Sequence, residues 1–143
     1  FVFTAQEEVG LRCAGAAAFA VEPDIAIAVD VTDTGDMPER KTPMAVDMGK
    51  GPAVKVMDRS VICTPAVRDA LEQAGTDCAV PTQREIMPFG GTDTAALQKA
   101  RAGVQAGAVS IPTRYVHSPS EMCAASDVEG AAKLLAQFAV SPN

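Results

Sequence analysis

An uninterrupted apolar run from Ile25 to Val29 is the feature that most constrains the fold of this chain. The run has the length of a strand, and it ends at Asp30. Strands made of continuous apolar residues are usually buried on both faces, and they belong to sheets that are covered by helices. The run therefore predicts an α/β protein.

The rest of the chain alternates between strand and helix signals. Thr64 and Pro65 supply a helix N-cap followed by proline at the first helical position, whereas residues 32–51 show no periodicity and predict a long loop of the kind that is often functional. This alternation predicts a three-layer α/β/α sandwich with a mixed, largely parallel sheet. The expected strands are 1–4, 25–29, 51–57, 81–87 and 106–112, and the expected helices are 9–20, 65–74, 90–102 and 126–138.

Length and charge limit the classes of function. A chain of 143 residues that is 48% hydrophobic can bury one core and fits one domain. The net charge of -6, without a run of Lys or Arg, provides no electrostatic surface for nucleic acid or anionic membrane. Because no stretch is typical of a spanning helix or a signal peptide, we expect a soluble, cytoplasmic protein with no nucleic-acid or membrane partner.

The cysteines and the start of the chain give two further expectations. The cysteines are widely spaced and form no Cys-x-x-Cys pair, so we expect reduced thiols and no structural zinc site. The chain begins at Phe1, inside a predicted strand, whereas domains seldom begin in the middle of a sheet. We therefore expect residues 1–143 to be the C-terminal part of something longer.

Four side chains that could bind metal follow predicted apolar strands. Glu7 and Glu8 follow the first strand, Asp30 follows the second, and His117, the single histidine, follows the last. Functional groups of α/β proteins gather where strands end, so these side chains are expected at one edge of the sheet. One carboxylate of an adjacent pair can bind a cation while the other activates a water, and carboxylate with imidazole suits zinc, cobalt or manganese. The pattern favours a catalytic metal site.

Each of these residues also has an ordinary structural explanation. Glu7 and Glu8 could stabilise the positive end of the following helix, Asp30 could cap a turn, and His117 could be a hydrogen-bonded loop residue. The Gly-Gly-Thr-Asp segment at 90–93 could be a loop with an N-cap. A glycosidase reading of the glutamate pair is the least favoured, because the two carboxyl groups of such enzymes lie about 5 to 9 Å apart and normally come from different segments.

Five ordered segments, which together extend over nearly the whole chain, resemble the C-terminal half of the glutamyl aminopeptidase family, which includes the tetrahedral aminopeptidases. They are Phe3–Arg12, Ala28–Thr32, Gly49–Ala53, Gly90–Asp93 and Ser110–Pro119. The resemblance implies a sandwich of the zinc-peptidase type. It also implies a metallopeptidase that removes N-terminal residues from peptides with two divalent ions, zinc or cobalt, and that often assembles into homo-oligomers.

The resemblance further implies individual roles. Glu7 matches the general base, which acts on a metal-activated water. Glu8 and His117 match the ligands of one metal, and Asp30 matches a carboxylate ligand of the other. Three residues match a motif that lines the substrate cleft, namely Gly91, Thr92 and Asp93.

Two elements of the family pattern lie upstream of the matched segments. They are a His from a His-x-Asp segment together with an Asp that bridges the two metals, and a small β-domain used in assembly. Glu8 and His117 could hold one ion weakly, whereas Asp30 alone could not hold the second. We therefore expect the chain alone to be inactive or nearly so, and to require a second polypeptide that supplies the missing ligands. The alternative is a truncated, non-catalytic family member that serves as an assembly or binding module and exposes an apolar surface.

Overall fold

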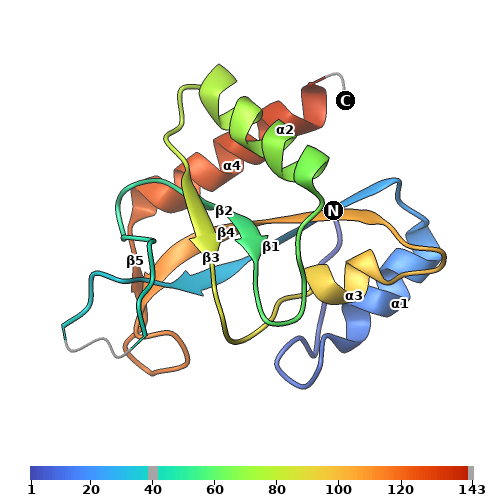
Figure 1. Cartoon of the computed structure of the whole chain (residues 1–143), viewed down its shortest axis with the longest axis horizontal. Helices are drawn as coiled ribbons and strands as arrows, with labels where there is room; N and C mark the ends of the chain where they lie inside the picture. The colour runs from blue at the N-terminus through green and yellow to red at the C-terminus, as the bar shows by residue number, and fades with distance from the viewer. Residues whose placement is uncertain (39–41, 142–143) are drawn as a thin grey trace.

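The computed structural model describes residues 1–38 and 42–141, which form a sheet with helices on both faces (Figure 1). The described elements are α1 (Arg12–Val21), β1 (Ile25–Asp33), β2 (Ala53–Met57), α2 (Pro65–Asp77), β3 (Gln83–Ile86), α3 (Thr94–Gln98), β4 (Gln105–Arg114), β5 (Met122–Cys123) and α4 (Ala125–Val140).

The sheet is mixed, as predicted. Its order is β1-β4-β2-β3, and the short β5 pairs with the end of β4. β1 runs parallel to β4 along its whole length, and β2 runs parallel to β3. β4 pairs antiparallel with β2 and with β5, so the two parallel pairs of strands meet at the antiparallel contact between β4 and β2.

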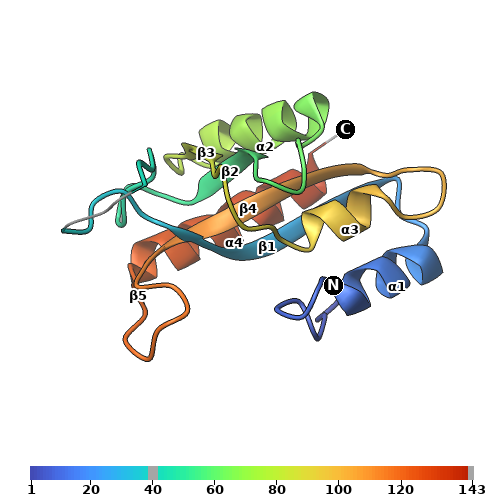
Figure 2. The same cartoon turned by 60° about the horizontal axis from the view of Figure 1, so that its bottom comes forward.

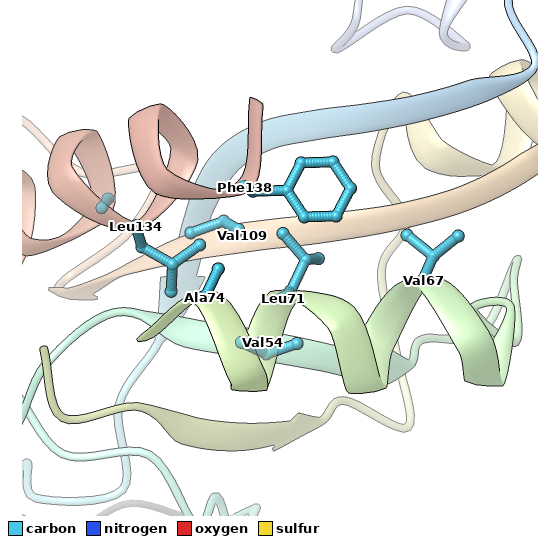
Figure 3. Close-up of a cluster of buried hydrophobic side chains, with 8 residues drawn as sticks. Val54, Val67, Leu71, Ala74, Val109, Leu134 and Phe138 are labelled. Carbon is cyan, nitrogen blue, oxygen red and sulfur yellow. The ribbon is translucent and has the colours of Figure 1, made fainter. Parts of the chain in front are cut away.

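The helices form the two outer layers of the predicted three-layer sandwich. α2 and α4 pack against each other and against one face of the sheet. α3 lies on the opposite face, and α1 packs against α3 (Figure 2). The apolar core lies between the sheet and the α2 and α4 layer (Figure 3). Its buried members are Val54, Val67, Leu71, Ala74, Val109, Ala131, Leu134 and Phe138.

Local signals fixed the start of α2. Thr64 has an extended backbone and Pro65 is the first helical residue, as the sequence predicts. A proline at this position lacks only an N–H group that the helix would leave unpaired. The helix continues to Asp77, three residues beyond the predicted end, and Gly75 is buried within it.

The loop before β2 is fastened to the start of α4. Asp127, in the first turn of α4, is 1% exposed. Its Oδ2 accepts a hydrogen bond from the Gly49 N–H at 2.7 Å, and its Oδ1 accepts one from the Gly51 N–H at 2.9 Å. Gly51 has a φ of +96°, and a Cβ there would lie 1.9 Å from the Pro81 carbonyl oxygen, so the position requires glycine.

The predicted strand at 1–4 is wrong. Residues 1–6 have no regular structure, and the side chains of Phe1 and Phe3 are fully exposed. A strand needs a hydrogen-bonded neighbour. The outer strand β1 pairs only with β4, and residues 1–6 pair with no strand of the described sheet.

The prediction that Ile25–Val29 is buried on both faces is also wrong. β1 is the outer strand of the described sheet. Ala26 and Ala28 are buried, but Val29 is 53% exposed. The strand continues to Asp33, so Asp30 lies within it and does not follow it as expected.

Two helix boundaries and one strand differ from expectation. The helix predicted at 90–102 is confined to α3, because residues 99–104 form tight turns in which Arg101 has a φ of +51°. α1 begins at Arg12 and not at residue 9, since Gly10 and Leu11 both have positive φ. The two-residue β5 carries too little pattern to predict.

The four cysteines are free thiols, as expected. Burial raises the pKa of the Cys63 thiol to about 11, so it stays protonated at neutral pH. Within the described ranges, no helix is long and apolar enough to cross a bilayer.

Candidate active site

An open pocket of about 440 Å³ lies beside β1 and receives most of the residues that the sequence singled out. The turn before α1, the loop before α3 and the loop after β4 form its other walls. Six of the predicted site residues line it, namely Glu7, Glu8, Asp30, Gly91, Thr92 and His117. Asp93 is not among the lining residues. The pocket also contains residues that the sequence did not single out, including Leu11, Val31, Thr32, Asp33, Ser60, Met87, Phe89 and Val116.

The two glutamates lie on a tight turn before α1. The Glu7 carbonyl accepts hydrogen bonds from the N–H groups of Gly10 at 3.0 Å and Leu11 at 2.9 Å. This turn leaves the Glu8 side chain 72% exposed, whereas Glu7 is partly buried. The pair therefore presents two carboxylates that both line the pocket but differ in exposure.

Glu8 and His117 lie together. The His117 Nδ1 is 3.6 Å from the Glu8 Oε2, and both side chains are largely exposed. The backbone N–H of His117 donates to Glu121 Oε1 at 2.5 Å, and His117 and Tyr115 both have positive φ. Positive φ is costly for residues other than glycine, so the tight loop after β4 holds the imidazole in this place against a backbone preference.

Asp30 lies deeper, on the strand itself. Its Oδ1 accepts a hydrogen bond from the Val31 N–H at 2.7 Å. The pKa of Asp30 is raised, first because the carboxyl group is buried, although that hydrogen bond and the positive charge of Lys55 oppose the shift. The carboxylate therefore carries its charge in a poorly solvated position.

Negative charge accumulates in the pocket. The pKa of Glu7 is raised, first by burial and then by the charges of Asp30, Glu8 and Asp93. A bound cation would relieve this repulsion. Among residues 1–38 and 42–141, however, no three His, Cys, Asp or Glu side chains are grouped so that they could share one metal ion. The pocket thus offers Glu8 with His117 at one point and Asp30 at another.

Gly90, Gly91 and Thr92 of the Gly-Gly-Thr-Asp segment form another wall of the pocket. Thr92 is buried, and its Oγ1 is 2.9 Å from the Thr94 Oγ1. Asp93 precedes α3, and its Oδ2 accepts a hydrogen bond from the Thr4 hydroxyl at 2.6 Å. Gly91 packs closely on a neighbouring turn, because a Cβ there would lie 2.7 Å from the Ser60 Oγ.

A buried cluster of three charged residues behind this wall was missed by the sequence analysis. The Lys55 Nζ lies 2.6 Å from the Glu85 Oε1 and 3.2 Å from the Asp58 Oδ2, and these three side chains are almost fully buried. A signal was available. Lys55 interrupts the apolar strand Ala53–Met57, and Asp58 follows that strand directly.

Comparison with known proteins identifies the family of the chain. The family model described as M42 glutamyl aminopeptidase matches residues 1–134. A curated relative from Acetivibrio thermocellus is 56% identical over 137 residues, which are 96% of this chain and 41% of the relative. The lysyl aminopeptidase of Pyrococcus furiosus is 39% identical over 93% of this chain and 38% of its own length. The chain therefore spans about two fifths of the length of the curated relatives it matches.

Solved structures share the fold. The aminopeptidase APDkam598 from the archaeon Desulfurococcus kamchatkensis superposes with a TM-score of 0.90 at 36% identity, covering 98% of this chain and 40% of that protein. The TET1 peptidase of Pyrococcus horikoshii, which can assemble into a tetrahedron or a large octahedral shell, gives a TM-score of 0.84 at 30% identity over 98% of this chain and 40% of that protein.

Proposed function

Because the chain belongs to the M42 glutamyl aminopeptidase family, we propose that it carries part of the active site of a metal-dependent aminopeptidase. The observation that supports this most strongly is the convergence of Glu7, Glu8, Asp30 and His117 on one pocket. The peptide substrate enters with its amino terminus toward these groups, beside Gly91 and Thr92 of the pocket wall and the adjacent Asp93.

The donor set suits divalent metal ions. Glu8 and His117 would hold one ion, and Asp30 would contribute to holding a second, zinc or cobalt in each case. Carboxylate oxygen and imidazole nitrogen are donors for these metals, and a cation bound here would offset the repulsion from neighbouring carboxylates that contributes to the raised pKa of Glu7. Bound ions of this type polarise the scissile carbonyl and lower the pKa of water.

Glu7 is the general base in this proposal. It takes a proton from the attacking water and passes it to the leaving amine. A general base works best when its pKa lies near the working pH, and the upward direction of the Glu7 shift favours this role. No nucleophilic side chain is required.

The described donors are too few for two ions, and the chain spans about two fifths of the length of its curated relatives, so ligands from outside residues 1–143 are part of the proposal. Those ligands are a His and a bridging Asp, and residues 1–143 alone are inactive or nearly so. The completed protein forms homo-oligomers, as the Pyrococcus horikoshii TET1 peptidase does.

The test is a complementation assay. The chain is mixed with the part of the Acetivibrio thermocellus relative that it does not match, and the hydrolysis of aminoacyl p-nitroanilides is measured with added zinc or cobalt. We expect activity only in the mixture, and we expect Glu7→Gln to lower kcat by at least about 100-fold. The matched control is Glu129→Gln, an exposed glutamate on α4. Activity of the chain alone at the rate of the mixture, or full activity of Glu7→Gln, would contradict the proposal.

A non-catalytic assembly module is the second candidate, because large apolar side chains are exposed on β1 and in the segment before α1. Phe1, Phe3, Val29 and Val31 belong to this set. The same exposure fits a surface that a second polypeptide covers in the active enzyme. Binding of the upstream part without any activity, in the presence of either metal, would favour the module.

A further inference from the structure

Behind the pocket wall lies a cluster of charged side chains that the proposed mechanism does not use. Lys55 and Glu85 are fully buried at paired positions of β2 and β3, and Asp58, just after β2, is 2% exposed. The Lys55 ammonium donates to the Glu85 Oε1 at 2.6 Å and lies 3.2 Å from the Asp58 Oδ2. The second Glu85 oxygen, Oε2, is buried and has no hydrogen-bond partner among residues 1–38 and 42–141.

The cluster is connected to the pocket through Asp58. Its Oδ1 accepts hydrogen bonds from the Ser60 N–H at 2.7 Å, the Ser60 hydroxyl at 2.7 Å and the Val61 N–H at 3.0 Å. Its Oδ2 faces the Thr92 hydroxyl at 3.5 Å. Ser60 and Thr92 both line the pocket, and Gly91 packs directly on Ser60.

Stability alone is a poor reason for this cluster. Removing three charges from water costs several kcal/mol per ion, and apolar residues of similar volume often serve a core at least as well. An unpartnered carboxylate oxygen adds to that cost. The Lys55 ammonium between the Asp58 and Glu85 carboxylates does, however, fix the orientation of both, and Asp58 holds the wall of the pocket.

We propose that Lys55 is a positioning residue of the site, acting through Asp58 to hold Ser60 and the Gly91–Thr92 wall in the geometry that receives substrate. Glu85 keeps the Lys55 ammonium in place from the other side. This inference rests on the proposed function for the identity of the substrate, whereas the mechanical link between Lys55 and the wall does not depend on it.

The first test is hydrogen exchange of the chain with Lys55→Met. We expect amides at 58–62 and 89–93 to exchange at least about tenfold faster, while those in α2 and α4 stay within about twofold of the unmodified chain. Arg84→Met is the matched control, since Arg84 precedes Glu85 on β3 but pairs with Glu72 at the surface. Unchanged exchange rates in the wall, or an equal increase of the exchange rates in α2 and α4, would overturn the proposal.

A milder variant covers the case in which Lys55→Met does not fold. Asp58→Asn keeps the shape of the side chain and one acceptor oxygen but removes the charge that Lys55 orients. We expect the same segments to exchange faster, by a smaller factor. If the wall keeps its protection in Asp58→Asn, the proposed link through Asp58 is wrong.

The second readout uses the complemented enzyme described above. Lys55→Met should raise KM for the aminoacyl p-nitroanilide by about tenfold with a smaller change in kcat, because the wall binds substrate and does not take part in proton transfer. A faster-exchanging wall with an unchanged KM would contradict a role in receiving substrate. Failure of the complementation assay with the unmodified chain would count against the proposed function, and the exchange result would still decide the link between Lys55 and the wall.

Discussion

The two faces of the sheet differ in composition although they are built from the same strands. In β2, Val54 packs in the apolar core under α2 and α4, while the next residue, Lys55, belongs to the buried charged cluster. In β4, Val109 lies in the core and Ser110 is buried on the other face. Because side chains alternate along a strand, each strand contributes to both layers.

One face of the sheet therefore carries most of the apolar packing, and the other carries the candidate active site. The α2 and α4 face is closed by large aliphatic side chains, whereas the opposite face is lined by alanine and by polar groups around Asp30 and the pocket. A core of close-packed apolar side chains tolerates little loss of volume. A face that gathers carboxylates holds groups whose charges repel one another, so it is expected to be a source of instability.

The largest effect is expected where the closed face is broken. Leu71→Ala removes a fully buried side chain from the core, and we expect the free energy of unfolding to fall by about 2–5 kcal/mol. The control is Val31→Ala on the exposed edge of β1, which should cost less than about 1 kcal/mol. Urea denaturation measures both. Equal losses would show that the closed core and the exposed edge of β1 contribute alike.

The next effect is expected at the loop before β2, which is hydrogen-bonded to Asp127 of α4. Asp127→Ala leaves the N–H groups of Gly49 and Gly51 without their acceptor, and we expect a loss of about 2–3 kcal/mol. Glu129→Ala, on the exposed side of the same helix, should change stability by less than about 0.5 kcal/mol. If both variants unfold at the same urea concentration, Asp127 is not the anchor described above.

A smaller, pH-dependent effect is expected at the ion pair between Asp36 and Arg114, the last residue of β4. The Arg114 guanidinium holds the pKa of Asp36 at about 2 through two hydrogen bonds. Because this folded pKa lies below the ordinary value of about 3.8, the contribution is present above that value and is lost as pH falls toward 2. Arg114→Met should therefore cost about 1 kcal/mol at pH 7, after allowance for partial exposure, and almost nothing near pH 2. A loss that is equal at both pH values would contradict this account.

The smallest effect should have the opposite sign. Burial raises the pKa of Asp30, so the folded chain holds its proton more tightly than the unfolded chain does. Stability then falls as pH rises through the interval between the two pKa values. Asp30→Asn should raise the unfolding free energy at pH 7 by up to about 1 kcal/mol and should have a smaller effect at pH 3. Asp24→Asn, at an exposed position just before β1, is the control. A destabilised Asp30→Asn at pH 7 would mean that the site is not under electrostatic strain.

The sequence predicted elements where the cause is local. The Thr64 and Pro65 signal gave the start of α2, and the apolar segments at 25–29 and 106–112 marked β1 and β4. It failed where the cause is not local. Two outcomes depend on what lies beside β1, namely whether residues 1–4 form a strand and whether Val29 is buried. The local sequence of these segments does not determine that neighbour.

The candidate site shows the same division. Glu7, Glu8, Asp30 and His117 could be found because carboxylates and imidazole follow or end apolar runs, and the structure brings all four to one pocket. Lys55 was missed because one lysine in an apolar strand resembles a solvent-facing residue at an edge. Only the packing of β2 beside β3 reveals that Glu85 and Asp58 enclose it.

The number of metal ions held by the chain tests the central claim most directly, because that claim is that this polypeptide carries part of a two-metal site. Native mass spectrometry with added zinc or cobalt should find at most one weakly bound ion on the chain alone, lost in His117→Ala, and two ions in the complex with the upstream polypeptide. Two firmly bound ions on the chain alone, or one that persists in His117→Ala, would contradict the account.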